Sequence, residues 1–256
     1  MELSPNKTVL VTGAGKRLGQ KMAASLGASG YRVAVHYNSS RDGADETVDT
    51  IRSTGGFSEA VQADLNDEAS LKQLVSDAGE ALGGHLGVLI NNASVFEEDD
   101  AMTHSRESWD MHMNVNLRAP IALSQAFATQ LPEKARGVII NMVDQRVWKL
   151  NPMFFTYTLS KAALWTATKT LAQALAPNVR VNAIGPGPTM QNARQQSDDF
   201  KAQVNATLTQ RGSSPEEIVK AMHFLLDADA VTGQMIAVDG GQHLIWQTPD
   251  VVDVIE

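Results

Sequence analysis

Thr12-Gly13-Ala14-Gly15-Lys16-Arg17-Leu18-Gly19 joins an apolar run, Thr8 to Val11, to a helix-like segment, Gln20 to Ser29. A glycine-rich turn that leads from a first strand into a helix is a cradle for phosphate. Its backbone N–H groups point at the ligand, and the helix N-terminus favours negative charge. Lys16 and Arg17 put two cations in this turn, which favours an extra phosphate, or another anionic or planar group, beside a dinucleotide. Taken alone, such a turn can also simply close a tight corner between strand and helix.

The composition limits the class of protein and its partners. The 256 residues are 43% hydrophobic and 20% charged, which suits one α/β domain over residues 1–256. A net charge of −8 argues against nucleic acid or an anionic membrane as the main partner. The chain has no cysteine, and its six histidines show no paired metal spacing, so no metal site is expected. No signal peptide or membrane-length apolar run is visible, so we expect a cytoplasmic protein.

Short β-branched runs alternate with longer helical patterns along the chain. We expect strands near 8–12, 31–37, 58–63, 86–91, 136–142, 178–184 and 234–238. We expect helices near 17–29, 41–54, 67–82, 103–131, 154–176 and 213–227. This alternation predicts a single-domain, Rossmann-like, doubly wound parallel sheet flanked by helices on both faces. Ligands of such sheets bind at the carboxyl ends of the strands, where the sequence places the glycine-rich loop, Asp64, Asn91-Asn92, Asp144 and Gly185-Pro186-Gly187.

Tyr157 and Lys161 lie four residues apart in a helical pattern, so their side chains share one face of the helix. Asp144 lies at the end of the predicted fifth strand, 13 residues before Tyr157. A nearby ammonium favours tyrosinate and lowers the pKa of a phenol, which makes Tyr157 a plausible proton donor. Tyr and Lys at this spacing are more often an ordinary amphipathic pair. The glycine-rich loop, Asn91-Asn92-Ala93 and Pro186-Gly187 make that interpretation improbable here.

From Thr8 to about Gly241 the chain resembles the short-chain dehydrogenase/reductase family. The motifs that carry the resemblance are T-G-A-G-K-R-L-G, Ala63-Asp64-Leu65, N-N-A-S, Y-T-L-S-K, Arg180-Val181-Asn182, P-G-P-T and Val238-Asp239-Gly240-Gly241. The resemblance implies an NAD(P)-dependent oxidoreductase with Tyr157 as the acid/base. It further implies that Lys161 binds the nicotinamide ribose and lowers the pKa of Tyr157, and that Asn116 holds a proton-relay water. Arg17 stands where the family usually has the middle glycine of the loop.

Asp144 is a departure from the family, which usually has Ser at this position. An ionised carboxylate cannot donate a hydrogen bond to a substrate carbonyl, and it would repel developing alkoxide charge. Three interpretations follow: the enzyme is inactive, Asp144 is protonated because it is buried near Tyr157, or the substrate presents N–H donors. A solvated turn residue is a fourth and weaker interpretation.

Arg17, Phe96 and Asp144 together resemble the pteridine reductase branch, which shares K-R-L-G, N-N-A-S-x-F and N-M-V-D before Y-x-x-x-K. The resemblance implies reduction of a pterin or folate ring by hydride from NADPH. Tyr157 would supply the proton, and Arg17, Phe96, Asp144 and Tyr157 would bind the ring. Phe96 can also be plain packing. One alternative is a generic carbonyl reductase acting on a ketone, sugar or acyl group, against which Asp144 argues. Another is a catalytically silent NADPH-binding sensor, which would not need Tyr157, Lys161 or Asn116.

The second strand indicates which nicotinamide cofactor is used. An NAD site usually carries an acid after this strand, but the first acid here is Asp42. A 2′-phosphate can instead be bound by Lys16, Arg17, Ser39, Ser40 and Arg41, which favours NADPH. Ser39-Ser40-Arg41 also suits a helix N-cap and first turn. We expect the cofactor to contact Gly13, Lys16, Arg17, Leu18, His36, Tyr37, Asn38, Ser39, Ser40, Asp64, Leu65, Asn92, Ala93, Ser94, Tyr157, Lys161, Pro186, Gly187 and Thr189.

The resemblance carries two further expectations. The polar, helix-like stretch near 190–210 corresponds to the family's mobile substrate lid. The helices predicted at 103–131 and 154–176 usually pair across a two-fold axis, so a homotetramer or homodimer is expected. Leu244-Ile245-Trp246 adds an apolar patch that suits such an assembly or simply caps the core.

Overall fold

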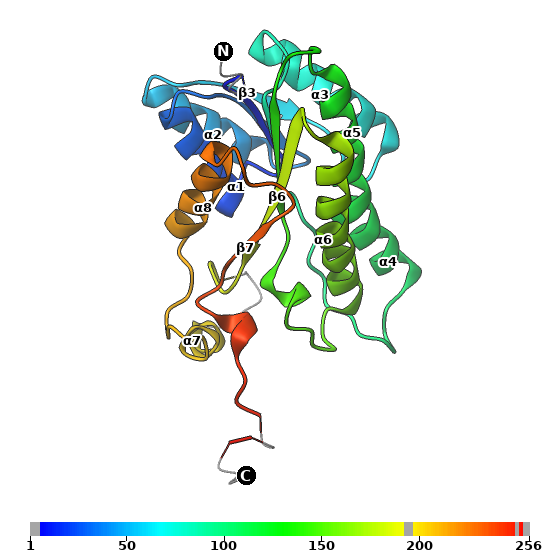
Figure 1. Cartoon of the computed structure of the whole chain (residues 1–256), viewed down its shortest axis with the longest axis vertical. Helices are drawn as coiled ribbons and strands as arrows, with labels where there is room; N and C mark the ends of the chain where they lie inside the picture. The colour runs from blue at the N-terminus through cyan, green and yellow to red at the C-terminus, as the bar shows by residue number, and fades with distance from the viewer. Residues whose placement is uncertain (1–5, 192–196, 249–250, 253–256) are drawn as a thin grey trace.

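The computed structural model describes residues 6–191, 197–248 and 251–252 of the chain. Within these residues, seven parallel strands form one sheet in the order β3-β2-β1-β4-β5-β6-β7. The chain starts in the middle of the sheet and winds outward to each edge in turn, which is the doubly wound topology predicted from the sequence (Figure 1). The strands are β1 (Thr8–Val11), β2 (Arg32–Tyr37), β3 (Phe57–Gln62), β4 (Val88–Asn91), β5 (Gly137–Met142), β6 (Val179–Pro186) and β7 (Met235–Val238).

Helices cover both faces of the sheet. Helices α1, α2 and α8 lie on one face, and α3, α5 and α6 lie on the other (Figure 1). None of the helices that the described residues form is long and apolar enough to cross a membrane. The α-helices are α1 (Arg17–Ala28), α2 (Arg41–Ser53), α3 (Glu68–Leu82), α4 (Arg106–Met113), α5 (Ala119–Gln130), α6 (Phe155–Leu175), α7 (Ser197–Asn205) and α8 (Pro215–Asp227).

The two layers follow from the alternation of side chains along each strand. In β1, Val9 and Val11 pack with residues of α1, α2 and α8, while Leu10 packs with residues of α3 and α5. All three side chains are fully buried, as expected for a central strand that is covered on both faces. The central strand is therefore fixed by packing on both sides, and the loops at its carboxyl end are built on a rigid base.

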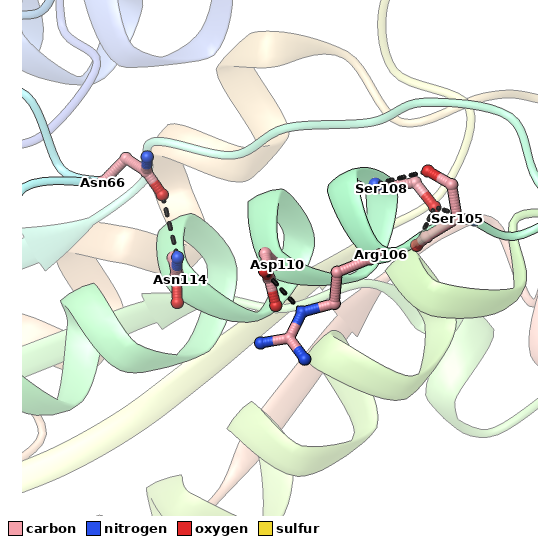
Figure 2. A network of polar contacts seen from close by, with 6 residues as sticks. All are labelled: Asn66, Ser105, Arg106, Ser108, Asp110 and Asn114. Carbon is pink, nitrogen blue, oxygen red and sulfur yellow. Dashed lines mark hydrogen bonds and ion pairs between the residues drawn. The ribbon is translucent and has the colours of Figure 1, made fainter.

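The helix predicted at 103–131 is interrupted. It begins only at Arg106, because Ser105 and Ser108 form a reciprocal capping box at the N-terminus of α4 (Figure 2). A π-helical turn over Asn114–Arg118 then separates α4 from α5. Such a turn inserts an extra residue into the helical repeat and is frequent at functional sites. Hydrophobic periodicity does not reveal it, since the residues on either side remain helical.

His36 joins the first three strands beneath the glycine-rich loop. Its Nδ1 accepts the Gly13 N–H at 3.0 Å, and its Nε2 lies 3.1 Å from the carbonyl of Ala63, to which it donates. The ring is therefore neutral with its proton on Nε2. Burial lowers the pKa of His36 from 6.5 to about 4, against weaker opposing effects of the Ala63 carbonyl and Asp64. The side chain supports the cofactor loop from below.

We expect His36 to make the fold less stable in acid. The unfolded chain takes up a proton on this ring below about pH 6.5, whereas the folded chain does so only near pH 4. The free energy of unfolding therefore falls as the pH drops through this window, by at most ~1.4 kcal/mol per pH unit from this group. His36→Asn retains an acceptor for Gly13 and does not titrate. Urea unfolding at several pH values should show a shallower slope for the variant, and equal slopes would contradict the assignment.

Candidate active site

The glycine-rich loop after β1 is shaped by two close approaches. Gly13 has a φ of +62°, and a Cβ there would lie 3.0 Å from the Cα of Ala93. A Cβ on Gly19 would lie 2.3 Å from the carbonyl oxygen of Gly13 and 2.6 Å from Asn92 Nδ2. Only glycine fits at Gly19, because the first turn of α1 packs directly on the loop. The loop therefore follows the backbone path that a phosphate cradle needs.

The loop after β4 is held against this cradle. Thr12 Oγ1 accepts the N–H groups of Asn92 and Ala93 at 2.9 and 3.0 Å, and Asn92 Nδ2 donates to the Thr12 carbonyl at 2.8 Å. Ser94 Oγ donates to Asn116 Oδ1 at 3.1 Å. The structure thus brings the predicted residues of the first and fourth strands together at one edge of the sheet.

Arg17 is in the left-handed region, with a φ of +54°. This conformation is easy for the glycine usual in the family and unfavourable for arginine. The guanidinium donates to the carbonyls of Met190 at 3.0 Å and Gln191 at 3.3 Å. In this structure Arg17 connects the loop after β1 to the chain after β6. The neighbouring Lys16 is exposed and occupies the N-cap position of α1, and Leu18 is half-buried.

The residues after β2 and β3 lie on the same edge of the sheet. Arg41 donates from Nη1 to the Tyr37 hydroxyl at 3.1 Å, and its Nε is paired with Asp45 at 2.9 Å. Asp45 therefore already neutralises part of the charge that Arg41 would offer a phosphate. Asn38 and Ser39 are exposed, and Ser40 precedes α2 without a capping hydrogen bond from its side chain. After β3, Leu65 is buried, and Asp64 Oδ1 accepts the Asn66 N–H at 2.9 Å.

Tyr157 and Lys161 lie on the first turns of α6, and Asp144 follows β5. The Tyr157 hydroxyl donates to Asp144 Oδ2 at 2.9 Å. Asp144 Oδ1 accepts the Arg146 N–H at 2.8 Å, which fixes the orientation of the carboxylate. Lys161 Nζ donates to the carbonyl of Met142 at 2.8 Å. The structure therefore brings together the three side chains that the sequence predicted would carry the chemistry.

Burial dominates the protonation of these groups. It raises the pKa of Asp144, and it lowers the pKa of Lys161 from 10.5 to about 8. The pKa of Tyr157 is raised well above its usual value, first by burial and then by the charge of Asp144 and the hydrogen bond to it. Burial and Asp144 thus act against the lowering of the Tyr157 pKa that is expected from Lys161, and that role of Lys161 stays a prediction. Lys161 Nζ lies 5.8 Å from the centre of the tyrosine ring, whereas the carboxylate touches the hydroxyl.

Asn116 lies in the π-helical turn and is fully buried. Its Oδ1 accepts the Val95 N–H at 2.8 Å, and its Nδ2 donates to the Val95 carbonyl at 2.9 Å and to Ser160 Oγ at 3.2 Å. The amide thereby links the loop after β4 to α6. Its role in holding a water stays a prediction.

Phe96 lies in the site beside the catalytic pair. The centroid of its ring lies 4.1 Å from that of Phe154, in a stacked arrangement. It lies 4.7 Å from the centroid of the Tyr157 ring, in an edge-to-face arrangement. The guanidinium carbon of Arg146 lies 5.3 Å from the centre of the Phe154 ring. Sequence reasoning missed Phe154 and Arg146. Phe154 carries only a weak signal, since it is one of two adjacent phenylalanines just before the Tyr157 motif, and its φ of +56° cannot be read from the sequence.

The chain after β6 returns to the cradle. Gly187 donates its N–H to the Val238 carbonyl at 3.0 Å, and a Cβ there would lie 2.6 Å from the Cα of Asp239. Pro186 ends β6, and the Thr189 hydroxyl lies 2.6 Å from Ser213 Oγ. Of the lid expected near 190–210, residues 192–196 lie outside the described residues, and α7 forms part of the remainder. Among the described residues, no three His, Asp or Glu side chains are grouped to hold a metal ion.

The chain is similar in sequence to known reductases and dehydrogenases over most of its length. Residues 13–243 match the model of a family described as enoyl-(acyl carrier protein) reductase. The chain is 37% identical over 246 residues to 3β-hydroxysteroid dehydrogenase 1 of Eggerthella lenta, covering 93% of this chain and 94% of the relative. It is 32% identical to a 3-oxoacyl-[acyl-carrier-protein] reductase of Staphylococcus epidermidis, covering 93% of this chain and all of the relative.

A solved structure is also similar over nearly the whole chain. FolM alternative dihydrofolate reductase 1 of Brucella canis, complexed with NADP, superposes with a TM-score of 0.93. It shares 44% sequence identity, and the match covers 98% of this chain and 99% of that one.

Asp144→Asn is expected to lower the pKa of Tyr157 toward its usual value. The change removes the negative charge beside the phenol, and that charge is one of the causes that raise the pKa. A titration followed by the ultraviolet absorbance of phenolate measures the effect. The chain has three tyrosines, so Tyr157→Phe identifies which part of the signal belongs to Tyr157. An unchanged or higher pKa in Asp144→Asn would contradict the direct coupling of the two groups.

Arg17→Gly is expected to separate backbone strain from the contact with the chain after β6. Glycine adopts the observed φ of +54° without the ~1–2 kcal/mol that an L-residue pays in the left-handed region. The loss of the bonds to Met190 and Gln191 should make that segment more sensitive to limited proteolysis, while the melting temperature stays level or rises. Arg17→Lys, which keeps the strain and loses the planar fork, is the matched control. Wild-type protease sensitivity in Arg17→Gly would show that these bonds do not hold the segment.

Proposed function

The chain belongs to the short-chain dehydrogenase/reductase family of oxidoreductases, and we propose that it reduces a pteridine or dihydrofolate-type ring with NADPH. The observation that carries the proposal is the 2.9 Å hydrogen bond from the Tyr157 hydroxyl to Asp144. A carboxyl at this position can accept from an N–H or an exocyclic amine of a heterocycle, whereas it cannot donate to a ketone when ionised. The similarity to a dihydrofolate reductase supports the same substrate class.

The residues at the edge of the sheet suit NADPH. Gly13 and Gly19 leave room for the pyrophosphate, because a Cβ at either position would crowd the backbone of the loop. Lys16 and Ser39 are exposed, and the sequence carries no acid after β2 before Asp42, where an NAD site usually has one earlier. Asp64, half-buried after β3, would contact the adenine. When bound, NADPH supplies the hydride.

Tyr157 and Asp144 supply the proton. Reduction of a C=N bond adds a hydride to carbon and a proton to nitrogen, so the phenol of Tyr157 must give up its proton and then regain one. Asp144 is in contact with that hydroxyl and has a raised pKa, so in its protonated form it can restore the proton of Tyr157. Protonated Asp144 becomes more abundant as the pH falls, so turnover should rise toward acid.

The substrate ring would lie against Phe96, whose ring borders Tyr157 at 4.7 Å. A flat heteroaromatic stacks on such a surface, while an aliphatic ketone gains less from it. Arg17 is exposed and would face the ring oxygen or the cofactor phosphate once it leaves the Met190 and Gln191 carbonyls. We also propose a homotetramer or homodimer, which light scattering would distinguish.

A carbonyl reductase is the second candidate, favoured by the 37% identity to a hydroxysteroid dehydrogenase. NADPH oxidation should be measured with dihydrobiopterin, dihydrofolate and a panel of simple ketones, at acidic and neutral pH. Turnover of a pteridine that is faster in acid is the expected result. Turnover of ketones alone would replace the proposal with the carbonyl reductase. Tight NADPH binding without any turnover would favour a sensor.

Two substitutions test the mechanism. Tyr157→Phe is expected to lower kcat on the order of 10²–10⁴-fold while leaving NADPH binding nearly intact, because only the proton donor is lost. Asp144→Ser installs the residue usual in the family, and it should lower pteridine turnover and abolish its rise toward acid. Pteridine turnover that survives in Tyr157→Phe would disprove the assigned proton donor.

A further inference from the structure

We propose that His112 is a positioning residue, which uses the lone pair of Nε2 to hold the segment 95–99, and with it Phe96, against Tyr157. The proposal deepens the proposed function and rests on it, since it assigns Phe96 and Tyr157 to the substrate site. His112 lies on α4, outside the motifs that carry the family resemblance, and it is fully buried. No motif in the sequence assigns His112 a role in the active site.

Both ring nitrogens of His112 have partners with defined hydrogen-bonding roles. The Glu97 N–H donates to Nε2 at 3.1 Å. Nδ1 lies 2.7 Å from Thr156 Oγ1. The single hydroxyl proton of Thr156 is donated to Asp99 Oδ2, so Thr156 Oγ1 is left to accept the proton of Nδ1. The ring is therefore neutral, with its proton on Nδ1 and its lone pair on Nε2.

The same network fixes the start of the catalytic helix. Asp99 accepts the N–H of Phe155 through its backbone carbonyl at 3.1 Å and the N–H of Thr156 through Oδ1 at 3.0 Å. A carboxylate at the N-terminus of a helix satisfies N–H groups that have no partner within the helix and complements the helix dipole. Asp99, the last residue of the segment 95–99, thus caps the N-terminus of α6 at Phe155 and Thr156, directly before Tyr157.

The segment 95–99 is consequently held at both ends. Asn116 binds Val95, and Asp99 binds the start of α6. Between them, the bond from Glu97 to His112 sets the path of the backbone next to Phe96. The His112 ring itself lies 6.0 Å from the ring of Tyr157, in an edge-to-face arrangement. A shift of this segment would change the distance between Phe96 and Tyr157.

Helix α4 can serve as the fixed support for this bond. Figure 2 shows the capping box of Ser105 and Ser108 at its N-terminus, the ion pair of Arg106 with Asp110, and the hydrogen bond from Asn114 to Asn66. The capping box and the ion pair stabilise α4 internally, and the bond to Asn66 ties its C-terminal end to the segment after β3, while His112 lies on its buried side. A helix that is capped and tied to another segment can hold the imidazole in place for the Glu97 N–H.

Burial keeps the His112 ring neutral against the acidic groups around it. Burial lowers the pKa of His112. Asp99, the Ser108 backbone and Glu97 oppose this effect, and Lys161 reinforces it. The Tyr157 ring also faces it. A second proton would put an Nε2–H against the Glu97 N–H, so that two donors would face each other. The segment 95–99 therefore requires an unprotonated Nε2 on His112, which accepts the Glu97 N–H.

Two variants separate the two hydrogen bonds of His112. The amide of His112→Gln reaches the position of Nε2 and can accept from Glu97, while it loses the bond to Thr156. The amide of His112→Asn reaches the position of Nδ1 and can donate to Thr156, while it leaves the Glu97 N–H without an acceptor. Each variant loses one buried hydrogen bond, so similar melting temperatures are expected. His85→Asn, at a half-buried histidine before β4 and away from this network, is the control.

Kinetics with the pteridine substrate give the first result. His112→Asn should lower kcat on the order of tenfold or more, because Phe96 and Tyr157 lose their relative placement. The KM for NADPH should not change, and His112→Gln should keep most of the wild-type kcat. Equal kcat values for the two variants at equal melting temperature would overturn the proposal. If wild-type protein turns over only ketones, the proposed substrate fails, and the same comparison is made with the best ketone.

Nitrogen-15 NMR of the histidine rings tests the proposal without any turnover. The His112 ring should show a protonated Nδ1 and an unprotonated Nε2 at neutral pH, identified by the loss of its signals in His112→Asn. The amide of Glu97 should shift in His112→Asn and stay close to its wild-type position in His112→Gln. A proton on Nε2 in the wild-type protein would overturn the proposal whatever the substrate is.

Discussion

The contact between the Tyr157 hydroxyl and the carboxylate of Asp144 is the constraint around which the site is arranged. At 2.9 Å the two groups share one hydrogen bond in a buried place, and burial disfavours the charged form of both. The Arg146 N–H partly offsets that cost at Asp144. The pair is therefore most stable with at least one proton between the two oxygens. When both groups carry a proton, the pair can release one to a substrate without creating two buried charges.

Burial and charge compete in this site, and their balance decides what Lys161 does. An ammonium near a phenol favours the phenolate, but here the carboxylate is in contact with the hydroxyl and the ammonium is farther away. Lys161 also donates to the Met142 carbonyl, and its own pKa is lowered to about 8 by burial. In this structure, the residue that replaces the family's usual Ser therefore controls the protonation of Tyr157 more strongly than Lys161 does. The substitution changes the proton chemistry of the site while the geometry of the fold is kept.

Much of the fold could be predicted because parallel strands bury side chains on both faces, and the sequence shows this as short β-branched runs such as Val33–Val35. Tyr157 and Lys161 could be paired because helical spacing is a local property, and Asp144 because strand ends converge on one edge of the sheet. The roles of Phe154 and His112 could not be predicted. The position of Phe154 depends on its left-handed backbone conformation, and the contact of His112 depends on a hydrogen bond to a different segment of the chain. The π-helical turn left no trace in the periodicity, since the residues on either side of it remain helical.

Two neutral histidine rings each accept a hydrogen bond from the backbone N–H of a loop in the site. His36 accepts the Gly13 N–H beneath the cofactor loop, and His112 accepts the Glu97 N–H beside the substrate site. In each ring the other nitrogen donates to an oxygen, so the tautomer is fixed by its neighbours, and the two rings carry opposite tautomers. A partly buried loop N–H gains from an acceptor, and an imidazole supplies one from a rigid ring anchored on a strand or helix. The loops that carry the chemistry thereby take their positions from the regular elements beneath them.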